Sequence, residues 1–186
     1  MNDVDILKKI EKKVLWLACW MIHNANHIRE NQDGLKVGGH QASSASIVSI
    51  MTALYFNILR PEDRVAVKPH ASPVFHAIQY LSGLQTKEKI ENFRGFGGAQ
   101  SYPSRTKDID DVDISTGSVG LGVAMTSFIS LIQDYIARKK FYNNRPLGRM
   151  IALVGDAELD EGNVYECLQE GWKHDLRNVW WIIDYN

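Results

Sequence analysis

Two side chains with oxygen donors, Asp156 and Asn186, are spaced so that a parallel sheet would bring them together. Residues 150–154 form an apolar run that fits a buried strand and ends in Gly155 and Asp156, and residues 179–183 form a second run that ends shortly before Asn186. Because parallel strands end at the same edge of a sheet, we expect both side chains to lie side by side there. A carboxylate and an amide oxygen at this edge suit Mg²⁺ or Ca²⁺ that also touches the phosphates of a ligand.

A glycine-rich run precedes the first of these strands. Residues 115–122 read Ser-Thr-Gly-Ser-Val-Gly-Leu-Gly and lead into a helix expected over residues 119–139. Such runs present backbone N–H groups to phosphate and permit its close approach. Tight packing of the helix on the sheet would explain the glycines equally well, so both interpretations stay open. On the first interpretation, Gly117, Gly120 and Gly122 contact a phosphate.

Two histidines stand where expected helices begin. His40 follows two glycines and precedes Ser43 at the start of one helix, and His70 lies between a short strand and Pro73 in the first turn of the next. Glycines let the backbone approach a ligand, and a helix N-terminus favours an anion. The simpler role of Ser43, a helix N-cap, is favoured on sequence alone. His40 by itself is more often structural than catalytic, but two histidines in such positions are more suggestive of function than either alone.

The composition excludes some classes of protein. The 186 residues are 45% hydrophobic, enough for one domain with a core. With 21 basic and 22 acidic residues the net charge is −1, which gives no broad basic surface for nucleic acid. The N-terminus has no signal-peptide pattern, and its longest apolar run, residues 14–22, is about half a membrane span. We therefore expect a cytoplasmic protein with no nucleic-acid or membrane partner.

Helical periodicity alternates with short apolar runs, which favours an α/β fold with a parallel sheet flanked by helices. Expected helices cover residues 3–32, 43–58, 72–82, 86–91 and 119–139, and expected strands cover residues 64–67, 150–154 and 179–183. Residues 93–118 lack periodicity, which indicates a functional or disordered loop. Residues 1–186 are treated as one domain. Because the sequence stops at the end of a strand, we expect an N-terminal portion of a longer polypeptide.

The motifs resemble those of the thiamine-diphosphate-dependent, transketolase-like family over nearly the whole chain. The run from Gly155 to Glu161, followed by Asn186, is similar to the family's Gly-Asp-Gly motif with its later Asn. Other motifs occur in the family's order: Gly-Gly-His40-x-x-Ser43, His70-Ala-Ser-Pro73, Asn92-Phe-Arg94, Ser101-Tyr102-Pro103 and the glycine-rich run. The Ser-Tyr-Pro motif and the acidic run look closest to the homodimeric pyruvate dehydrogenase E1 component.

The resemblance implies a thiamine-diphosphate-binding fold in which Asp156 and Asn186 bind the Mg²⁺ that clamps the cofactor's diphosphate. The third metal ligand, a backbone carbonyl, would fall just beyond Asn186. In the family the counterparts of His40, His70 and Tyr102 bind substrate or relay protons. The implied cofactor contacts are Ser43, Gly117, Val119, Gly120, Gly122, Gly155, Asp156, Ala157, Glu158 and Asn186.

Two positions depart from the family pattern. Ala157 stands where the motif usually has Gly, which adds a methyl group near the diphosphate and disfavours a positive φ. Lys68 and Pro69 precede the second histidine, where some family members have Gln-Gly. Lys68 is expected either to add charge near the pocket entrance or to be solvated, and substrate identity stays open.

The implied activity is cleavage and transfer at a 2-oxo acid carbonyl, as in pyruvate dehydrogenase E1, with acyl transfer to the lipoyl group of an E2 partner. One alternative is a transketolase that moves two-carbon ketol units between sugar phosphates, and another is a non-catalytic remnant of the cofactor domain. The full-length protein is expected to be a homodimer. In this family the glutamate that activates the cofactor belongs to a different domain, so residues 1–186 alone are expected to be inactive.

Overall fold

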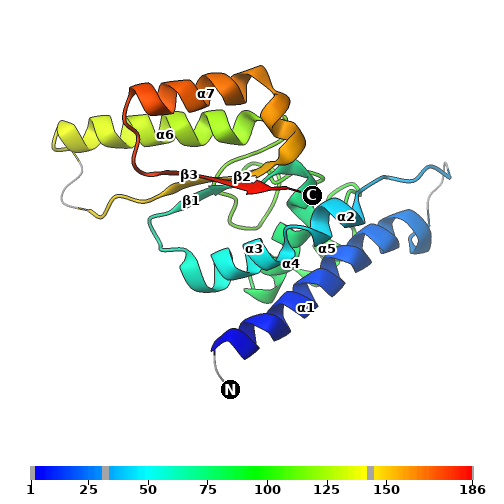
Figure 1. The fold of residues 1–186 in the computed structure, drawn as a ribbon. Helices are drawn as coiled ribbons and strands as arrows, with labels where there is room; N and C mark the ends of the chain where they lie inside the picture. The colour runs from blue at the N-terminus through cyan, green and yellow to red at the C-terminus, as the bar shows by residue number, and fades with distance from the viewer. Residues whose placement is uncertain (1–2, 31–33, 142–144, 186) are drawn as a thin grey trace. The chain divides into compact units, whose positions relative to one another are not determined.

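The computed structural model describes residues 3–30, 34–141 and 145–185 (Figure 1). The chain divides into two compact units. The first unit combines Met1–Leu59 with Pro69–Val112, and the second combines Arg60–Lys68 with Asp113–Asn186. Each unit has its own buried residues.

The second unit is built on a parallel sheet of three strands. These are β1 (Arg64–Ala66), β2 (Met150–Gly155) and β3 (Val179–Asp184), in the order β1-β2-β3. The predicted parallel sheet is therefore confirmed. The register pairs Gly155 with Asp184, so β2 and β3 end at the same edge. Helices α6 (Leu121–Arg138) and α7 (Gly162–Lys173) lie along one face of the sheet, and the short 3-10 turn η4 (Asp156–Asp160) joins β2 to α7 (Figure 1).

Burial explains why these residues form a parallel sheet with a close helix. The first five residues of β2 are buried, as expected for the central strand of a parallel sheet. Ala66 and Ala152, both fully buried, pair across β1 and β2 and belong to the core of this unit. Gly122 at the start of α6 approaches so closely that a Cβ there would lie 3.1 Å from the Cβ of Ala66. The small residues thus let the helix settle against the sheet.

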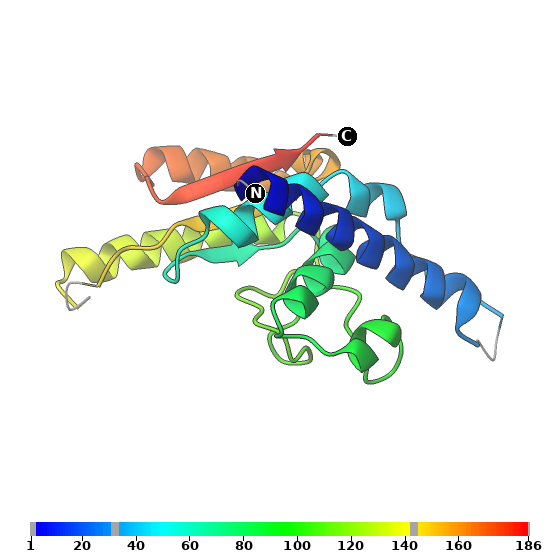
Figure 2. The same ribbon diagram turned by 90° about the horizontal axis from the view of Figure 1, so that it is seen from below.

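The first unit is helical. Helix α1 (Asp3–His23) continues into a π-helical turn, η1 (Asn24–Ile28), and packs against α4 (Ser72–Leu81). The remaining elements are α2 (Gln41–Ala45), α3 (Val48–Ala53), the π-helical turn η2 (Leu54–Ile58), the 3-10 turn η3 (Pro69–Ala71) and α5 (Lys87–Glu91). Figure 2 shows the irregular segment that follows α5 as green loops beside α4 and α5. Val14, Met21, Phe75 and Phe93 form the buried interior.

Several helix boundaries differ from the sequence-based expectation. The second helix begins at Gln41, and His40 occupies its N-cap position without a side-chain hydrogen bond. Ser43 therefore lies inside the first turn, and its predicted N-cap role is wrong. The first helix changes to π-helical hydrogen bonding after His23, before the expected end at residue 32. None of the described helices is both long and apolar enough to cross a lipid bilayer.

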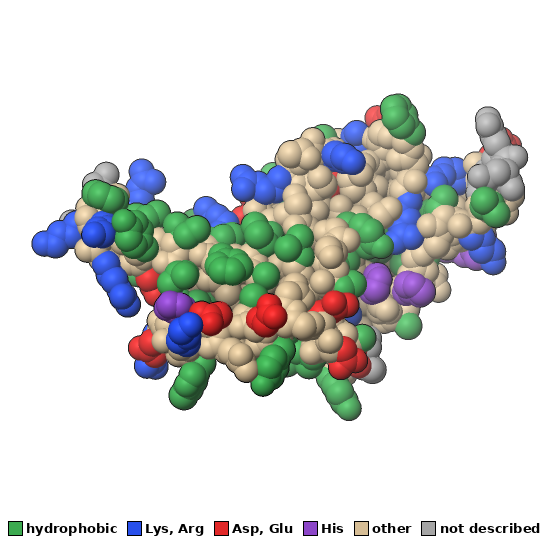
Figure 3. Space-filling model, turned by 90° about the horizontal axis from the view of Figure 1, so that it is seen from above, with side chains coloured by type: hydrophobic (Ala, Val, Ile, Leu, Met, Phe, Trp, Pro, Cys, Tyr) green, Lys and Arg blue, Asp and Glu red, His purple; other side chains and the backbone are tan. Residues whose placement is uncertain are grey.

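Apolar side chains are exposed along the outer side of α6 and α7. They gather on the face seen in Figure 3. On α6 they recur at every third or fourth position, and on α7 Trp172 is 89% exposed. The exposed apolar residues of α6 are Leu121, Met125, Phe128, Ile132 and Tyr135. This spacing places them on one face of the helix, which we call the α6 stripe.

A buried carboxylate joins the starts of β1 and β2. Asp63 is 5% exposed and accepts hydrogen bonds from the backbone N–H of Arg60 at 2.9 Å and of Arg149 at 2.7 Å. The guanidinium of Arg149 also pairs with it, with Nε at 3.1 and 3.0 Å from the two carboxylate oxygens. Burial alone would raise the pKa of the Asp63 carboxyl, but hydrogen bonds from Arg149 and Arg60 outweigh it and lower that pKa.

We expect Asp63→Asn to lower the free energy of unfolding by about 2–3 kcal/mol at pH 7, since hydrogen bonds to a charged group are lost. A lowered native pKa stabilises the fold above the unfolded-state pKa, and this contribution is lost as the pH falls through the native pKa. The difference between wild type and variant should therefore shrink below about pH 4. Urea unfolding between pH 7 and pH 3 measures it, with exposed Asp111→Asn as control. A difference that stays constant over this range would contradict the assignment.

Candidate functional site

Asp156 stands directly after β2, at the edge of the sheet where parallel strands end. Its side chain is partly buried, and no described residue hydrogen-bonds or pairs with its carboxylate. Asn186, the other predicted metal ligand, lies outside the described residues. The pairing of Gly155 with Asp184 shows that β2 and β3 end at one edge of the sheet, as expected for parallel strands. A carboxylate without a protein partner at this position fits a hard divalent cation.

Glu158 ties the glycine-rich segment to the end of β2. Its Oε2 accepts the backbone N–H of Gly155 at 2.6 Å, and its Oε1 accepts the backbone N–H of Gly120 at 3.1 Å. Gly120 precedes α6 with a left-handed backbone (φ 77°), and a Cβ there would lie 2.6 Å from Oδ1 of Asn163. Only glycine fits such a position. Glu158 thus positions two stretches of backbone that the sequence assigned to cofactor binding.

At the remaining predicted cofactor contacts in this unit, packing accounts for the residue type at some positions but not at others. Gly122 packs on Ala66, so the alternative explanation of helix packing accounts for it. A Cβ at Gly117 would meet no atom within 4 Å, so packing does not account for this glycine and space for a ligand remains. Val119 is 38% exposed. Ala157 is exposed, and it is not among the described non-glycine residues with a positive φ.

In the first unit the structure brings the two predicted histidines together. The ring centroids of His40 and His70 are 5.6 Å apart, with an interplanar angle of 73°, and both residues are exposed. Fully buried Ser44 donates a hydrogen bond from Oγ to the carbonyl of His70 at 3.4 Å, which joins α2 to the turn before α4. Ser43, the residue chosen from the sequence, is partly buried beside it. The role of Ser43 in the cofactor pocket stays a prediction.

Tyr102, the third predicted catalytic residue, is 37% exposed on the irregular segment after α5. Its neighbour Ser101 accepts a hydrogen bond through its carbonyl from Oγ of Ser72, the first residue of α4, at 2.5 Å. This bond ties the Tyr102 loop to the helix start that follows His70 by two residues. The same unit therefore holds all three predicted catalytic side chains on segments joined through the start of α4.

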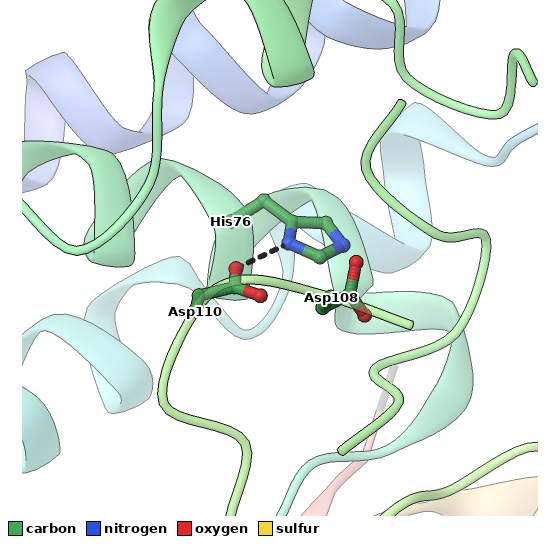
Figure 4. Close-up of side chains that lie close together, drawn as sticks. All are labelled: His76, Asp108 and Asp110. Atoms are coloured by element: carbon green, nitrogen blue, oxygen red, sulfur yellow. Dashed lines mark hydrogen bonds and ion pairs between the residues drawn. The ribbon is translucent and has the colours of Figure 1, made fainter. Parts of the chain in front are cut away.

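A buried cluster that the sequence did not reveal anchors the same loop. His76 on α4, Asp108 and Asp110 offer potential ligand atoms that all lie within 4.8 Å of one another. Figure 4 shows both carboxylates approaching the ring. The Nδ1 of His76 lies 2.7 Å from Oδ2 of Asp110, and Nε2 lies 3.0 Å from the carbonyl oxygen of Gln100. Asp108 accepts the backbone N–H groups of Gln100 at 3.0 Å and of Ser104 at 2.8 Å.

Hydrogen bonding, and not metal binding, explains this cluster as it stands. A carbonyl only accepts, so Nε2 of His76 carries a proton and donates it to Gln100. Burial would lower the pKa of His76, but the hydrogen bond and charge of Asp110, with the charge of Asp108, outweigh it and raise that pKa. Both ring nitrogens are then donors, and neither offers a lone pair to a metal. The cluster is a buried ion pair that fixes the 100–110 segment on α4.

A parallel sheet with two helices along one face, a carboxylate where β2 ends and a glycine-rich helix start together define an α/β protein. A sequence profile of the family described as transketolase, thiamine diphosphate binding domain, matches residues 37–186. The chain belongs to this family of thiamine-diphosphate-dependent enzymes, and the resemblance inferred from its motifs is confirmed.

Similar proteins carry two different names. The chain is 26% identical over 196 aligned residues to the pyruvate dehydrogenase E1 component of Mycolicibacterium smegmatis, covering 100% of this chain and 20% of that protein. It is 30% identical over 159 residues to transketolase-like protein 2 of Mus musculus, covering 80% of this chain and 24% of that protein. The chain thus spans about a fifth to a quarter of the length of these relatives.

Solved structures support the same fold. The transketolase from Leishmania mexicana superposes with a TM-score of 0.82 at 19% identity, covering 97% of this chain and 27% of that chain. A transketolase mutant from Pichia stipitis gives 0.81 at 21% identity, covering 96% of this chain and 26% of that chain. The predicted fold class, a partial thiamine-diphosphate-binding domain with a parallel sheet, is therefore confirmed.

We expect His76→Gln to destabilise the protein, by about 3–5 kcal/mol, because Asp110 loses its buried cation. A raised native pKa contributes stability fully below the unfolded pKa of about 6.5 and loses it as the pH rises through the native value. The difference from wild type should therefore be largest near pH 6 and shrink in alkaline solution. Urea unfolding from pH 6 to pH 9 measures this, with exposed His174→Gln as control. A His76 signal that titrates below pH 6.5 by NMR would disprove the ion pair.

We expect Glu158→Ala to release the backbone of Gly120 and Gly155, since both N–H groups lose their acceptor. The loss should lower local stability by about 1–2 kcal/mol and speed amide exchange at these two residues about tenfold. Hydrogen–deuterium exchange read by NMR provides the measurement. Asp160→Ala on the same turn is the control and should leave both amides unchanged. Unaltered exchange at Gly120 in Glu158→Ala would refute the positioning role.

Proposed function

We propose that this chain binds thiamine diphosphate through Mg²⁺ and serves as the cofactor-binding part of an E1-type 2-oxo acid dehydrogenase. The observation that carries the proposal is the carboxylate of Asp156, which has no partner among the described residues and stands at the carboxyl end of β2. Family membership supports the cofactor. The carboxylate supports the metal, because Mg²⁺ prefers one or two carboxylates together with phosphate oxygens.

The residues of the second unit divide the work of holding the cofactor. Asp156 and Asn186 would hold Mg²⁺, and backbone N–H groups near Gly117 would face the diphosphate. Glu158 keeps the glycine-rich segment in place. In the first unit His40, His70 and Tyr102 would bind substrate or transfer protons. When bound, thiamine diphosphate supplies the nucleophilic carbon and the electron sink for cleavage beside a carbonyl.

An E1 enzyme and a transketolase use different substrates, so an activity assay distinguishes them. The Ser101-Tyr102-Pro103 motif and the acidic run after Gly155 support E1 by resemblance. The names of the mouse relative and of the solved structures support transketolase as the second candidate. Reductive acylation of a lipoyl domain by pyruvate, assayed with the complete protein, would favour E1. Ketol transfer from xylulose 5-phosphate to an aldose phosphate would favour transketolase.

A homodimer is part of the proposal. The α6 stripe supports it, because exposed apolar residues at helical spacing are typical of surfaces that a partner covers. We take the partner to be a second copy, following the family resemblance. Light scattering on the complete protein tests it, and a monomer at micromolar concentration would contradict it.

We expect Asp156→Asn to weaken Mg²⁺-dependent binding of thiamine diphosphate by about 100-fold or more, because even indirect supports of a metal site contribute 10–100-fold. Isothermal titration calorimetry of the complete protein with thiamine diphosphate and Mg²⁺ gives the affinity. Asp160→Asn, an exposed carboxylate on the same turn, is the matched control and should bind like wild type. Unchanged affinity in Asp156→Asn would exclude it as a ligand, and no binding by wild type would leave the non-catalytic alternative.

A further inference from the structure

Lys68 lies at the same sheet edge as Asp156 but is almost completely buried. It is 5% exposed, and its Nζ lies 2.5 Å from Oδ2 of Asp184, which is 4% exposed. The expectation that Lys68 could be a solvated side chain is therefore wrong. Lys68 follows β1, and Asp184 ends β3, so the ion pair joins two strands that do not pair with each other. The sequence separation of 116 residues gave no signal for it.

The lysine side chain passes over the end of the middle strand. A Cβ built on Gly155, the last residue of β2, would lie 3.9 Å from Cδ of Lys68. Gly155 pairs with Asp184 and directly precedes Asp156. The edge thus carries two carboxylates on neighbouring strand ends, with one ammonium group bound to one of them. Two carboxylates in such a place are the donor set that divalent cations prefer.

Charge balance distinguishes the two carboxylates. Asp184 is buried, and a buried carboxylate is costly unless it is paired or hydrogen-bonded. Lys68 supplies that cation from within the chain. No described residue supplies one to Asp156. The two acidic residues at the edge therefore differ in whether a metal ion is needed to neutralise them.

We propose that Lys68 is a specificity-determining residue. Its ammonium group is the counter-ion of Asp184 and keeps that carboxylate from binding a metal, so that the divalent cation binds at Asp156. The role of Asp156 in this statement rests on the proposed function. The effect of Lys68 on Asp184 does not, because it follows from the ion pair alone. The geometry therefore gives a test that needs neither cofactor nor substrate.

The test removes the ammonium group and offers the metal alone. Lys68→Met keeps the length of the side chain without its charge, so Asp184 should become available to a divalent cation. Binding of Mn²⁺ to the complete protein, without thiamine diphosphate, is followed by the loss of the free-ion EPR signal. We expect Lys68→Met to bind Mn²⁺ at least tenfold more tightly than wild type and to melt at a higher temperature in Mn²⁺ than in EDTA.

Lys68→Met/Asp184→Asn is the matched control, because it removes both charges. It should lose the gain in Mn²⁺ affinity, and its melting temperature should not depend on Mn²⁺. Equal Mn²⁺ binding by wild type and Lys68→Met would overturn the proposal, and so would a gain that persists in the double variant. If Lys68→Met unfolds in EDTA, recovery of the fold by Mn²⁺ supports the proposal and no recovery overturns it.

A second variant removes the carboxylate of the ion pair and keeps the ammonium group. Asp184→Asn leaves the Lys68 ammonium without this carboxylate near Asp156, so we expect Mg²⁺-dependent thiamine diphosphate affinity to fall at least tenfold. Lys68→Met/Asp184→Asn should restore it to within about threefold of wild type, and equal affinities in both variants would contradict the proposal. Wild type that binds no thiamine diphosphate would refute the proposed function, while the Mn²⁺ result would still decide the role of Lys68.

Discussion

The parallel register of β1, β2 and β3 is the constraint on which the proposed cofactor edge depends. Because Gly155 pairs with Asp184, the segments that leave β2 and β3 start from one edge, and β1 adds the segment that begins with Val67 and Lys68. Backbone hydrogen bonds fix this alignment, and the buried apolar residues of β2 prevent a slip. Residues far apart in the sequence thereby share one small region at the ends of the three strands.

Three buried carboxylates of this protein are paired with a positively charged side chain of the same chain. Asp63 is neutralised by Arg149, Asp110 by His76 and Asp184 by Lys68. Such pairs contribute little net stability compared with apolar residues, but removing one partner is costly, so they fix which segments must lie together. Asp156 differs because none of the described residues pairs with its carboxylate. A bound cation would therefore neutralise more negative charge at Asp156 than at the carboxylates that already have a partner.

The sequence predicted local structure well and long-range polar contacts poorly. The runs at β2 and β3 were recognised because apolar stretches with β-branched residues have few other solutions, and their parallel pairing followed from the helix between them. The His76–Asp110 pair spans 34 positions and the Lys68–Asp184 pair spans 116, and neither has a periodicity to reveal it. The second helix was expected to begin at Ser43 and begins at Gln41, because a helix start cannot be located to one residue from sequence. The positions of Asp156 and of both histidines were accessible because each follows or precedes a recognisable element.

The two departures from the family pattern have unequal physical consequences. Ala157 is exposed and has a negative φ, so its methyl group neither strains the backbone nor displaces another residue. Lys68 places an ammonium group, paired with Asp184, in a buried position at the sheet edge, where low polarity strengthens electrostatic interactions. A ligand at this edge would therefore experience a different field from one in a relative with glutamine there, while Ala157 would leave that field unchanged. Differences in metal or substrate preference between this chain and its relatives should accordingly be sought at Lys68 and its partner Asp184 before Ala157.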